Sequence, residues 1–306
     1  MIKLILIAGF LGAGKTTLLQ SVLDSYKDEK VGVIINEFGE VNIDAALVRK
    51  EGIEMMELSN GSIFCACIKD RFVESLIAMS GQDISCLFIE ASGLADPANM
   101  GRILESVKPR LLSPYDYRGS VCVVDAETYL ELSDILPALA GQVEYSGGIL
   151  INKADLADSQ KIEAVSRALS LQNPDAGQFV TSYCRMDMRT LVDGLEPVEK
   201  EDRDTTNTVE SRPKTFIIKS AAPVDLEALE GFLETLAPQA YRIKGFAHTK
   251  DGVKEVSAVR ERIRVSPWDA EVPAMELVVI SAVGIRMMSL IAAALNRKGI
   301  KGKLVL

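Results

Sequence analysis

A glycine-rich loop near the start of the chain constrains its fold more than any other feature. The residues Gly9-Phe10-Leu11-Gly12-Ala13-Gly14-Lys15-Thr16 fit the pattern G-x-x-x-x-G-K-[ST] without a mismatch. The apolar run Ile2–Ala8 before this loop predicts a buried strand, and Thr17–Leu23 after it predicts a helix. In this arrangement backbone N–H groups and the helix N-terminus face a phosphate. The sequence therefore predicts a site for a nucleoside triphosphate.

Individual residues of this loop have distinct expected roles. We expect Lys15 to reach the outer phosphates and to act in catalysis, and the Thr16 hydroxyl to ligate Mg²⁺. The loop as a whole is expected to surround the nucleotide; its predicted binding residues are Gly9, Gly12, Ala13, Gly14, Lys15, Thr16 and Thr17.

From residue 1 to about 195, apolar segments alternate with amphipathic ones. The predicted strands are Ile2–Ala8, Val31–Ile35, Ile53–Leu58, Ile84–Glu90, Ser120–Val124, Gly148–Ile151 and Gln178–Thr181. Helices are predicted between most of them, for example over Arg71–Met79, Pro97–Val107 and Ser159–Leu171. This alternation predicts the α/β class: a P-loop NTPase domain with a mostly parallel sheet covered by helices on both faces. Ligands of such sheets bind beyond the carboxyl ends of the strands.

A polar, charged segment separates this region, predicted as a nucleotide-binding P-loop domain over residues 1–195, from a second unit. Residues 196–213 hold few large apolar side chains and are predicted to be a linker. Residues 214–306 are predicted to form a smaller C-terminal α+β domain with an antiparallel or mixed sheet and two helices on one face. Its predicted strands are Thr215–Lys219, Ala240–Thr249, Glu255–Val265, Glu276–Ser281 and Lys303–Leu306, and its predicted helices are Asp225–Leu236, capped by Asp225, and Ile285–Leu295, ending near Gly299.

The composition restricts the kinds of partner. The chain of 306 residues has a net charge of −9, which argues against a general nucleic-acid surface or an anionic-membrane surface. No apolar run approaches the ~20 residues that cross a bilayer. The chain otherwise has the features of a cytoplasmic protein, so its five cysteines, an odd number, are expected to be reduced thiols.

The segment Asn152-Lys153-Ala154-Asp155 follows a late strand and fits N-K-x-D, the guanine-reading pattern of GTPases. The Asp155 carboxylate is expected to accept hydrogen bonds from the guanine ring N–H and amine, where adenine presents the opposite pattern. The stem of Lys153 is expected to lie along the base. Ser182 follows the next strand and is expected to close over the base, with a plain loop as the alternative. The pattern favours GTP and GDP over adenine nucleotides.

Carboxylates follow two further strands near the expected Mg²⁺. Glu90 ends a strand and precedes Gly93, where many GTPases have D-x-x-G. We expect Glu90 to hold the water shell of Mg²⁺ and Gly93 to sense the γ-phosphate. Glu37 and Glu40 lie in the expected switch loop and could orient the attacking water or ligate a second metal. A solvated acidic loop is the alternative for these two residues.

Cys65 and Cys67 form the one close pair of cysteines. Two thiolates at this spacing can bind a soft cation such as Zn²⁺ or Co²⁺, with a carboxylate, for which Glu37 is the candidate, or a water completing the site. Packing in the core is the alternative, because cysteine is among the most buried residue types. Cys86 and Cys122 lie on apolar strands and are predicted to pack as small hydrophobic residues.

Together these motifs resemble the CobW-type GTPases, relatives of the UreG and HypB metallochaperones. The blocks that carry the resemblance are Asn36–Glu40 followed by Ile43 and Asp44, Glu57–Gly61, Ile89–Pro97, Val123–Asp125 and Asn152–Asp155. The resemblance implies a slow, Mg²⁺-dependent GTPase whose switch is coupled to delivery of zinc, cobalt or a metal-containing cofactor. The nucleotide residues that it implies are Gly9–Thr17, Glu90 and Asn152–Asp155.

One block departs from the family pattern, in which a C-x-C-C motif directly follows Asn-Gly. In an ungapped match, Ser62 and Phe64 occupy the positions of the first two cysteines. A short insertion would instead make Cys65-x-Cys67 the C-x-C, with Ile68 in place of the last cysteine. The chain has a single histidine, so the histidine-rich metal store common in the family is missing.

The sequence leaves alternative functions open. The first is GTP hydrolysis coupled to delivery of a metal or metallocofactor to a client metalloprotein or cofactor-dependent enzyme. The second is a GTP-dependent switch that reactivates a partner enzyme, for example a corrinoid enzyme, without a metal cargo of its own. A P-loop kinase or ATPase is a third interpretation, which a preference for GTP would exclude.

Overall fold

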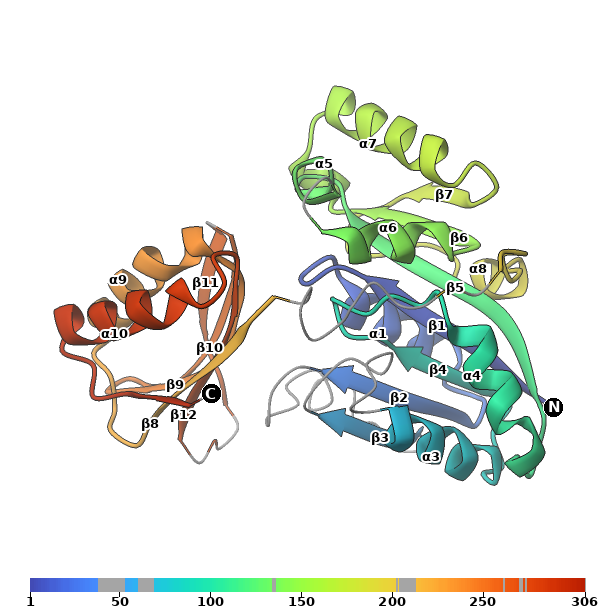
Figure 1. Cartoon of the computed structure of the whole chain (residues 1–306), viewed down its shortest axis with the longest axis horizontal. Helices are drawn as coiled ribbons and strands as arrows, with labels where there is room; N and C mark the ends of the chain where they lie inside the picture. Colours follow the sequence, from blue (N-terminus) through green and yellow to red (C-terminus); the bar gives the residue numbers. More distant parts are fainter. Residues whose placement is uncertain are drawn as a thin grey trace. The chain divides into compact units, whose positions relative to one another are not determined.

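The computed structural model describes residues 1–37, 53–59, 69–133, 136–201, 203, 213–260, 262–269, 272 and 274–305. By their contacts the residues divide into two compact units, Met1–Ser211 and Arg212–Leu306 (Figure 1). Each unit has its own sheet and its own hydrophobic core. None of the helices in the described ranges is both long enough and apolar enough to cross a bilayer.

The first unit contains a seven-stranded sheet in which every pairing between described strands is parallel. Its strands are β1 (Ile2–Gly9), β2 (Val31–Glu37), β3 (Ile53–Ser59), β4 (Cys86–Glu90), β5 (Tyr115–Asp125), β6 (Gly148–Asn152) and β7 (Gly177–Val180). Their order in space is β3-β2-β4-β1-β5-β6-β7. The chain therefore builds one side of the sheet before it crosses β1 to build the other. The carboxyl end of β1 is the place where sheets of this kind bind ligands.

Helices cover both faces of this sheet, as predicted (Figure 1). They are α1 (Lys15–Ser25), α3 (Lys69–Ser80), α4 (Met100–Val107), α5 (Tyr129–Ser133), α6 (Pro137–Glu144), α7 (Ser159–Gln172) and α8 (Met188–Asp193), with short 3-10 helices at Lys108–Arg110 and Ala154–Leu156. Alternate side chains of β1 enter different cores. Ile5 and Ile7 pack with residues of α1 and α8, whereas Leu4 and Leu6 pack with residues of α3 and α4. Burial on both faces explains why β1 is apolar throughout.

Several elements begin at residues other than those predicted. β5 starts at Tyr115 rather than Ser120, because its polar first residues pair with β1 from Ile2 onward. α4 starts at Met100 rather than Pro97, since the preceding residues form a turn in which the Met100 N–H donates to the Pro97 carbonyl. α1 starts at Lys15, two residues earlier than predicted. These differences arise at element ends, where pairing and turns outweigh local propensity.

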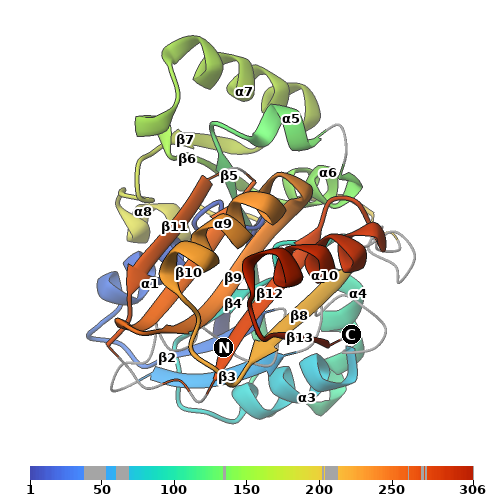
Figure 2. The ribbon, with the colours of Figure 1, turned by 90° about the vertical axis from the view of Figure 1, so that its left-hand side faces the viewer.

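The second unit contains a six-stranded sheet whose described pairings are all antiparallel. Its elements are β8 (Thr215–Ser220), α9 (Leu226–Leu236), the 3-10 helix Ala237–Gln239, β9 (Ala240–Thr249), β10 (Gly252–Val259), β11 (Arg262–Pro267), β12 (Met275–Ser281), α10 (Arg286–Lys298) and β13 (Lys303–Val305). The strand order is β11-β10-β9-β12-β8-β13. Figure 2 shows α9 and α10 side by side over one face of this sheet. The prediction of an antiparallel or mixed sheet with two helices on one face is confirmed, and the described pairings are all antiparallel.

One strand prediction in the second unit is wrong. The segment Glu255–Val265 is not a single strand, because the chain reverses at Arg260, whose φ is +51°. β10 and β11 on either side of it pair with each other. The reversal contains neither glycine nor proline, so its sequence carries no turn signal. The predicted helix ends are confirmed: Asp225 accepts from the N–H of Glu227, and Gly299 ends α10 in the left-handed conformation.

Candidate functional site

The loop between β1 and α1 has the backbone conformation that phosphate-binding loops require. Gly9, Gly12 and Gly14 have φ angles of +136°, +79° and +118°. A Cβ on Gly14 would lie 2.4 Å from Nδ2 of Asn152, so a larger residue does not fit there. No side chain caps α1, which begins at Lys15, and its first turn holds no acidic residue. Its first N–H groups and the positive end of its dipole are therefore suited to an anion.

Lys15 and Thr16 are the first two residues of α1. Lys15 is buried, and its Nζ donates to the carbonyl of Phe10 at 3.2 Å, so the ammonium lies against the loop. The Thr16 hydroxyl donates to Oε1 of Glu90 at 3.0 Å. Glu90 ends β4 and is 3% exposed. A hydroxyl beside a buried carboxylate is a donor set typical of Mg²⁺ sites in P-loop enzymes. The two residues predicted to hold Mg²⁺ are thus in contact.

Asn152 connects the phosphate loop to the loop after β7. Its Nδ2 donates to the carbonyl of Ala13 at 2.8 Å. Its Oδ1 accepts from the N–H of Cys184 at 2.9 Å and from the hydroxyl of Thr181 at 3.3 Å. The carboxamide is buried, so these bonds form away from competing water. Asn152 therefore holds three segments of the candidate nucleotide site in register.

The remaining residues predicted to contact the base lie together beside Asn152. The Asp155 side chain is exposed, and its N–H donates to Oγ of Ser182 at 3.1 Å. Lys153 has a left-handed backbone, with φ of +61°, and its Nζ lies 2.6 Å from Oδ2 of Asp125. The structure therefore brings Ser182 against the N-K-x-D segment.

Two residues of this region were assigned no role from the sequence. Cys184 is buried, and its Sγ lies 3.5 Å from the carbonyl of Gly14. Burial raises the pKa of its thiol to about 12, so the thiol is neutral at physiological pH. Asp125 ends β5, binds Lys153 and accepts from the N–H of Glu127 at 2.9 Å. The position of Asp125 at the end of an apolar strand is a signal that could have identified it, whereas nothing local singles out Cys184.

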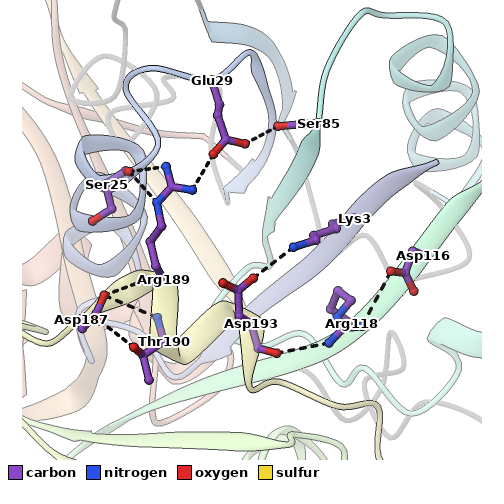
Figure 3. A network of polar contacts seen from close by, with 10 residues as sticks. All are labelled: Lys3, Ser25, Glu29, Ser85, Asp116, Arg118, Asp187, Arg189, Thr190 and Asp193. Atoms are coloured by element: carbon purple, nitrogen blue, oxygen red, sulfur yellow. Dashed lines mark hydrogen bonds and ion pairs between the residues drawn. The ribbon is translucent and has the colours of Figure 1, made fainter.

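A polar network fixes α8, the helix that follows the base loop (Figure 3). Arg189 donates to the carbonyl of Ser25 through Nη2 at 2.9 Å and through Nε at 3.2 Å. The same guanidinium binds the carboxylate of Glu29. Asp193, at the end of α8, lies 3.0 Å from Nζ of Lys3. Because Ser25 ends α1 and Lys3 belongs to β1, this network joins α8 to both elements that carry the phosphate loop.

The predicted transition-metal ligands fall largely outside the described residues. Glu37 is the last residue of β2 and pairs in register with Ser59, and its side chain is not described. Glu40, Cys65 and Cys67 lie outside the described ranges. Within those ranges, no group of three or more His, Cys, Asp or Glu side chains is arranged to hold a metal ion. Cys86 and Cys122 are buried in the sheet as predicted.

Comparison with protein families decides the family of the chain. The model described as CobW/HypB/UreG, nucleotide-binding domain, matches residues 3–180, which is more than half of the chain. The chain belongs to this family. The model of the cobalamin synthesis protein cobW C-terminal domain matches residues 214–297, in the second unit. The resemblance to CobW-type proteins inferred from the motifs is therefore confirmed.

Curated relatives in the CobW/HypB/UreG family include zinc chaperones. The zinc chaperone YjiA of Escherichia coli (strain K12) is 28% identical over 267 residues, which cover 80% of this chain and 81% of YjiA. The zinc-regulated GTPase metalloprotein activator 1 of Dictyostelium discoideum is 28% identical over 292 residues, covering 79% of this chain and 62% of that protein. The zinc chaperone CobW of Pseudomonas aeruginosa is 37% identical over 208 residues, covering 57% and 55%. This chain thus spans less than two thirds of the length of the latter two relatives.

Solved structures that are similar to this chain include two metal-bound proteins. The Zn(II)-bound YjiA GTPase from E. coli has 24% identity and a TM-score of 0.48, covering 95% of this chain and 97% of that chain. HypB from Helicobacter pylori in complex with nickel has 20% identity and a TM-score of 0.42, covering 63% and 83%. At these identities the likeness concerns the fold alone.

Proposed function

We propose that this chain is a Mg²⁺-dependent GTPase that couples slow GTP hydrolysis to delivery of a metal or a metal-containing cofactor to a client protein. The observation that carries the proposal is the 2.8 Å hydrogen bond from Asn152 to the carbonyl of Ala13. It joins the N-K-x-D segment to the phosphate loop. The groups suited to guanine and those suited to phosphates therefore belong to one site.

GTP and Mg²⁺ fit the residues present at this site. Lys15 would neutralise the outer phosphates, and the Thr16 hydroxyl would ligate Mg²⁺ while Glu90 holds a coordinated water. When bound, Mg²⁺ supplies positive charge that stabilises the phosphate oxygens in the transition state. The exposed carboxylate of Asp155 would accept from the guanine ring N–H and amine. We propose that Glu37 or Glu40 orients the attacking water.

Two features support slow turnover and a metal cargo. The sequence offers no obvious catalytic arginine or glutamine. In other GTPases such an arginine speeds hydrolysis by ~10³–10⁵-fold, and the glutamine orients the attacking water. Relatives that bear the name zinc chaperone support zinc as the cargo, with cobalt as the other soft cation that thiolates suit. Cys65, Cys67 and Glu37 are the proposed ligands. The client would be a metalloprotein or a cofactor-dependent enzyme, and delivery would take place in the cytoplasm.

A Co²⁺ titration of the reduced protein tests this proposal, because thiolate-to-cobalt absorption reports on the cysteines directly. It is done once with a non-hydrolysable GTP analogue and once with GDP. We expect a sulfur-ligated site whose affinity differs between the two nucleotides. The double variant Cys65→Ser, Cys67→Ser should lose the absorption and keep its GTP affinity. Cys122→Ser is the matched control, since this buried thiol lies within the sheet and should leave the absorption unchanged.

The departure from the C-x-C-C pattern at Ser62 and Phe64 favours one competing function, a GTP-dependent switch that acts on a partner enzyme without its own cargo. In that case neither nucleotide state would show thiolate absorption, while GTP would still bind and be hydrolysed. Hydrolysis of ATP in preference to GTP would reject both functions.

A further inference from the structure

A continuous series of contacts leads from the phosphate loop to the segment that precedes the second unit. It starts at Gly93, three residues after Glu90. A Cβ on Gly93 would lie 2.6 Å from the backbone nitrogen of Leu11 and 2.5 Å from its side chain. Leu11 belongs to the phosphate loop. The backbone at Gly93 is therefore packed against the phosphate loop. Because the contact leaves no space, a displacement of either segment requires the other to move.

Helix α6 holds the other side of the loop that follows β4. Gln142 is 1% exposed, and its Nε2 donates to the carbonyls of Gly93 at 3.2 Å and Ala95 at 2.8 Å. The neighbouring Gly141 lies so close that a Cβ on it would be 2.3 Å from Oδ1 of Asp96. The loop from Gly93 to Asp96 is thus packed between the phosphate loop and α6.

Arg203 fastens a distant part of the chain to this loop. Its backbone N–H donates to the carbonyl of Ala98 at 3.0 Å. Its guanidinium lies 3.3 Å from Oδ2 of Asp96 and 3.5 Å from Oε2 of Glu144, and 5.5 Å from the centre of the Tyr145 ring. Asp96 is 0% exposed, and a carboxylate buried in this way needs charged or hydrogen-bonding partners. Loss of the guanidinium would therefore disturb the loop itself.

Arg203 lies in the segment 196–213, which the sequence predicts to connect the two domains. The hydroxyl of Tyr145 also donates to the carbonyl of Glu201 at 2.9 Å. Glu201 and Arg203 of this segment therefore contact the end of α6 and the loop after β4.

We propose that Arg203 is a positioning residue that couples the loop carrying Gly93 to the segment that leads into the second domain. This proposal rests on the proposed GTPase function, because it requires that the γ-phosphate of bound GTP contacts the Gly93 end of this loop. A γ-phosphate that draws on Gly93 moves Asp96, three residues further on, and with it Arg203. Coupling between two binding sites is reciprocal. If GTP in place of GDP changes the affinity for a client that displaces Arg203, that client changes the affinity for GTP relative to GDP by the same factor.

The test compares Arg203→Ala with Arg203→Lys and with Arg118→Ala as a matched control. Arg118 forms a half-buried ion pair with Asp116 and donates to the carbonyl of Asp193, but no contact with this loop is among its contacts in the described structure. Two quantities are measured for each protein. One is the ratio of the affinities for a GTP analogue and for GDP, and the other is the hydrogen exchange of the peptide that contains Arg203 in each nucleotide state.

In the wild-type protein we expect this exchange to differ by about three-fold or more between the two nucleotides. Arg203→Ala should abolish the difference and change the affinity ratio by about five-fold or more, since allosteric couplings span ~5–150-fold. Arg203→Lys should be intermediate, because an ammonium keeps the charge without the planar fork that reaches two carboxylates. Arg118→Ala should behave like the wild type.

Asp96→Asn provides a second variant that keeps the shape of the buried side chain. Both Asp96→Asn and Arg203→Ala weaken the Arg203–Asp96 ion pair, which is the contact proposed to carry the coupling. Asp96→Asn should therefore also reduce the exchange difference, and adding it to Arg203→Ala should change the exchange no further. If GTP binds but the exchange difference survives in Arg203→Ala, the coupling is refuted and the GTPase proposal stands. If the wild-type protein binds neither guanine nucleotide, both proposals fail.

Discussion

The hydroxyl of Thr16 donates to the carboxylate of Glu90 at 3.0 Å, although the two residues are 74 positions apart in the chain. The parallel pairing of β1 with β4 creates this contact, because it brings the N-terminus of α1 and the end of β4 to the same edge of the sheet. The pair supplies a neutral oxygen and a carboxylate for one Mg²⁺. Several expected outcomes follow from this site and its neighbours.

Replacing Thr16 by alanine removes the neutral oxygen ligand and leaves the carboxylate. We expect the Mg²⁺-dependent part of the GDP and GTP affinity to fall by about ten-fold or more, by analogy with the cost of perturbing metal sites. Thr16→Ser keeps the hydroxyl and should therefore keep most of the Mg²⁺-dependent affinity of the wild type. Nucleotide titrations with Mg²⁺ and with a chelator measure this difference. Equal Mg²⁺ dependence in Thr16→Ala and the wild type would show that Thr16 is not a ligand.

Replacing Asn152 by alanine breaks the link between the phosphate loop and the base loop. Three hydrogen bonds disappear, so we expect the free energy of unfolding to fall by about 1–3 kcal/mol and nucleotide affinity to fall by about ten-fold or more. Asn173→Ala is a matched control, because the buried Asn173 amide donates to the carbonyls of Val143 and Ser146, which precede β6, whereas Asn152 is at the carboxyl end of β6. The control should lose similar stability in urea unfolding but keep its affinity for GDP. A similar loss of affinity in both variants would mean that Asn152 acts only through stability.

Replacing Asp155 by asparagine should change the base that the site prefers. Guanine offers two donors to a carboxylate, and a carboxamide can accept from only one of them. Xanthine carries an oxygen in place of the guanine amine, so the carboxamide introduced by Asp155→Asn could donate to that oxygen. We expect GTP affinity to fall by about 100-fold and xanthosine triphosphate affinity to rise. Competition binding measures both.

Asp158→Asn is the control for that experiment. Asp158 is a nearby acidic residue that caps α7 by accepting from the N–H of Lys161 at 2.8 Å. Its replacement should leave base preference unchanged. An unaltered preference for guanine in Asp155→Asn would count against the assignment of Asp155 to the base.

The buried Cys184 thiol should make stability fall at alkaline pH. Burial raises its pKa to about 12. In the unfolded chain a thiol has a pKa of about 8.5, so above that pH the unfolded state loses its proton first and gains stability relative to the folded state. Above about pH 8.5, titration of Cys184 should therefore lower the free energy of unfolding by up to about 1.4 kcal/mol per pH unit. Below that pH the thiol is protonated in both states, so it contributes no pH dependence.

Cys184→Ser removes the titration and keeps a small donor beside the carbonyl of Gly14. Its free energy of unfolding should decline less steeply than that of the wild type when urea unfolding is compared at about pH 8, 9 and 10. Parallel declines in the two proteins would show that this thiol does not titrate as its burial implies.

The sequence by itself determined those features whose cause is local. The glycines before Lys15 predict a loop whose backbone can surround a phosphate, and in the structure Gly9, Gly12 and Gly14 have positive φ angles, which residues with a side chain avoid. Asp225 predicts the start of α9 and Gly299 the end of α10, since each acts on backbone groups only a few positions away. Uninterrupted apolar runs predict strands buried on both faces, and β1 is such a strand.

The turn at Arg260 and the first residues of β5 show where local signals end. Nothing in the residues around Arg260 distinguishes a turn from a continuing strand, and the reversal becomes favourable only when β10 and β11 pair. Tyr115–Arg118 have the polar pattern of a loop, yet they extend β5 because β1 offers them hydrogen-bonding partners. In both cases the partner strand decides the conformation.

Only the tertiary structure decided which loops meet. Asn152 reaches Ala13 across 139 positions, and Arg203 reaches Asp96 across 107. Both contacts depend on the order β3-β2-β4-β1-β5-β6-β7, which collects the carboxyl ends of β1, β4 and β6 at one edge. Periodicity specifies which faces of a strand are buried but not which strand lies beside it. That choice is made by the packing of the whole sheet, so the site residues could be named from the sequence while their contacts could not.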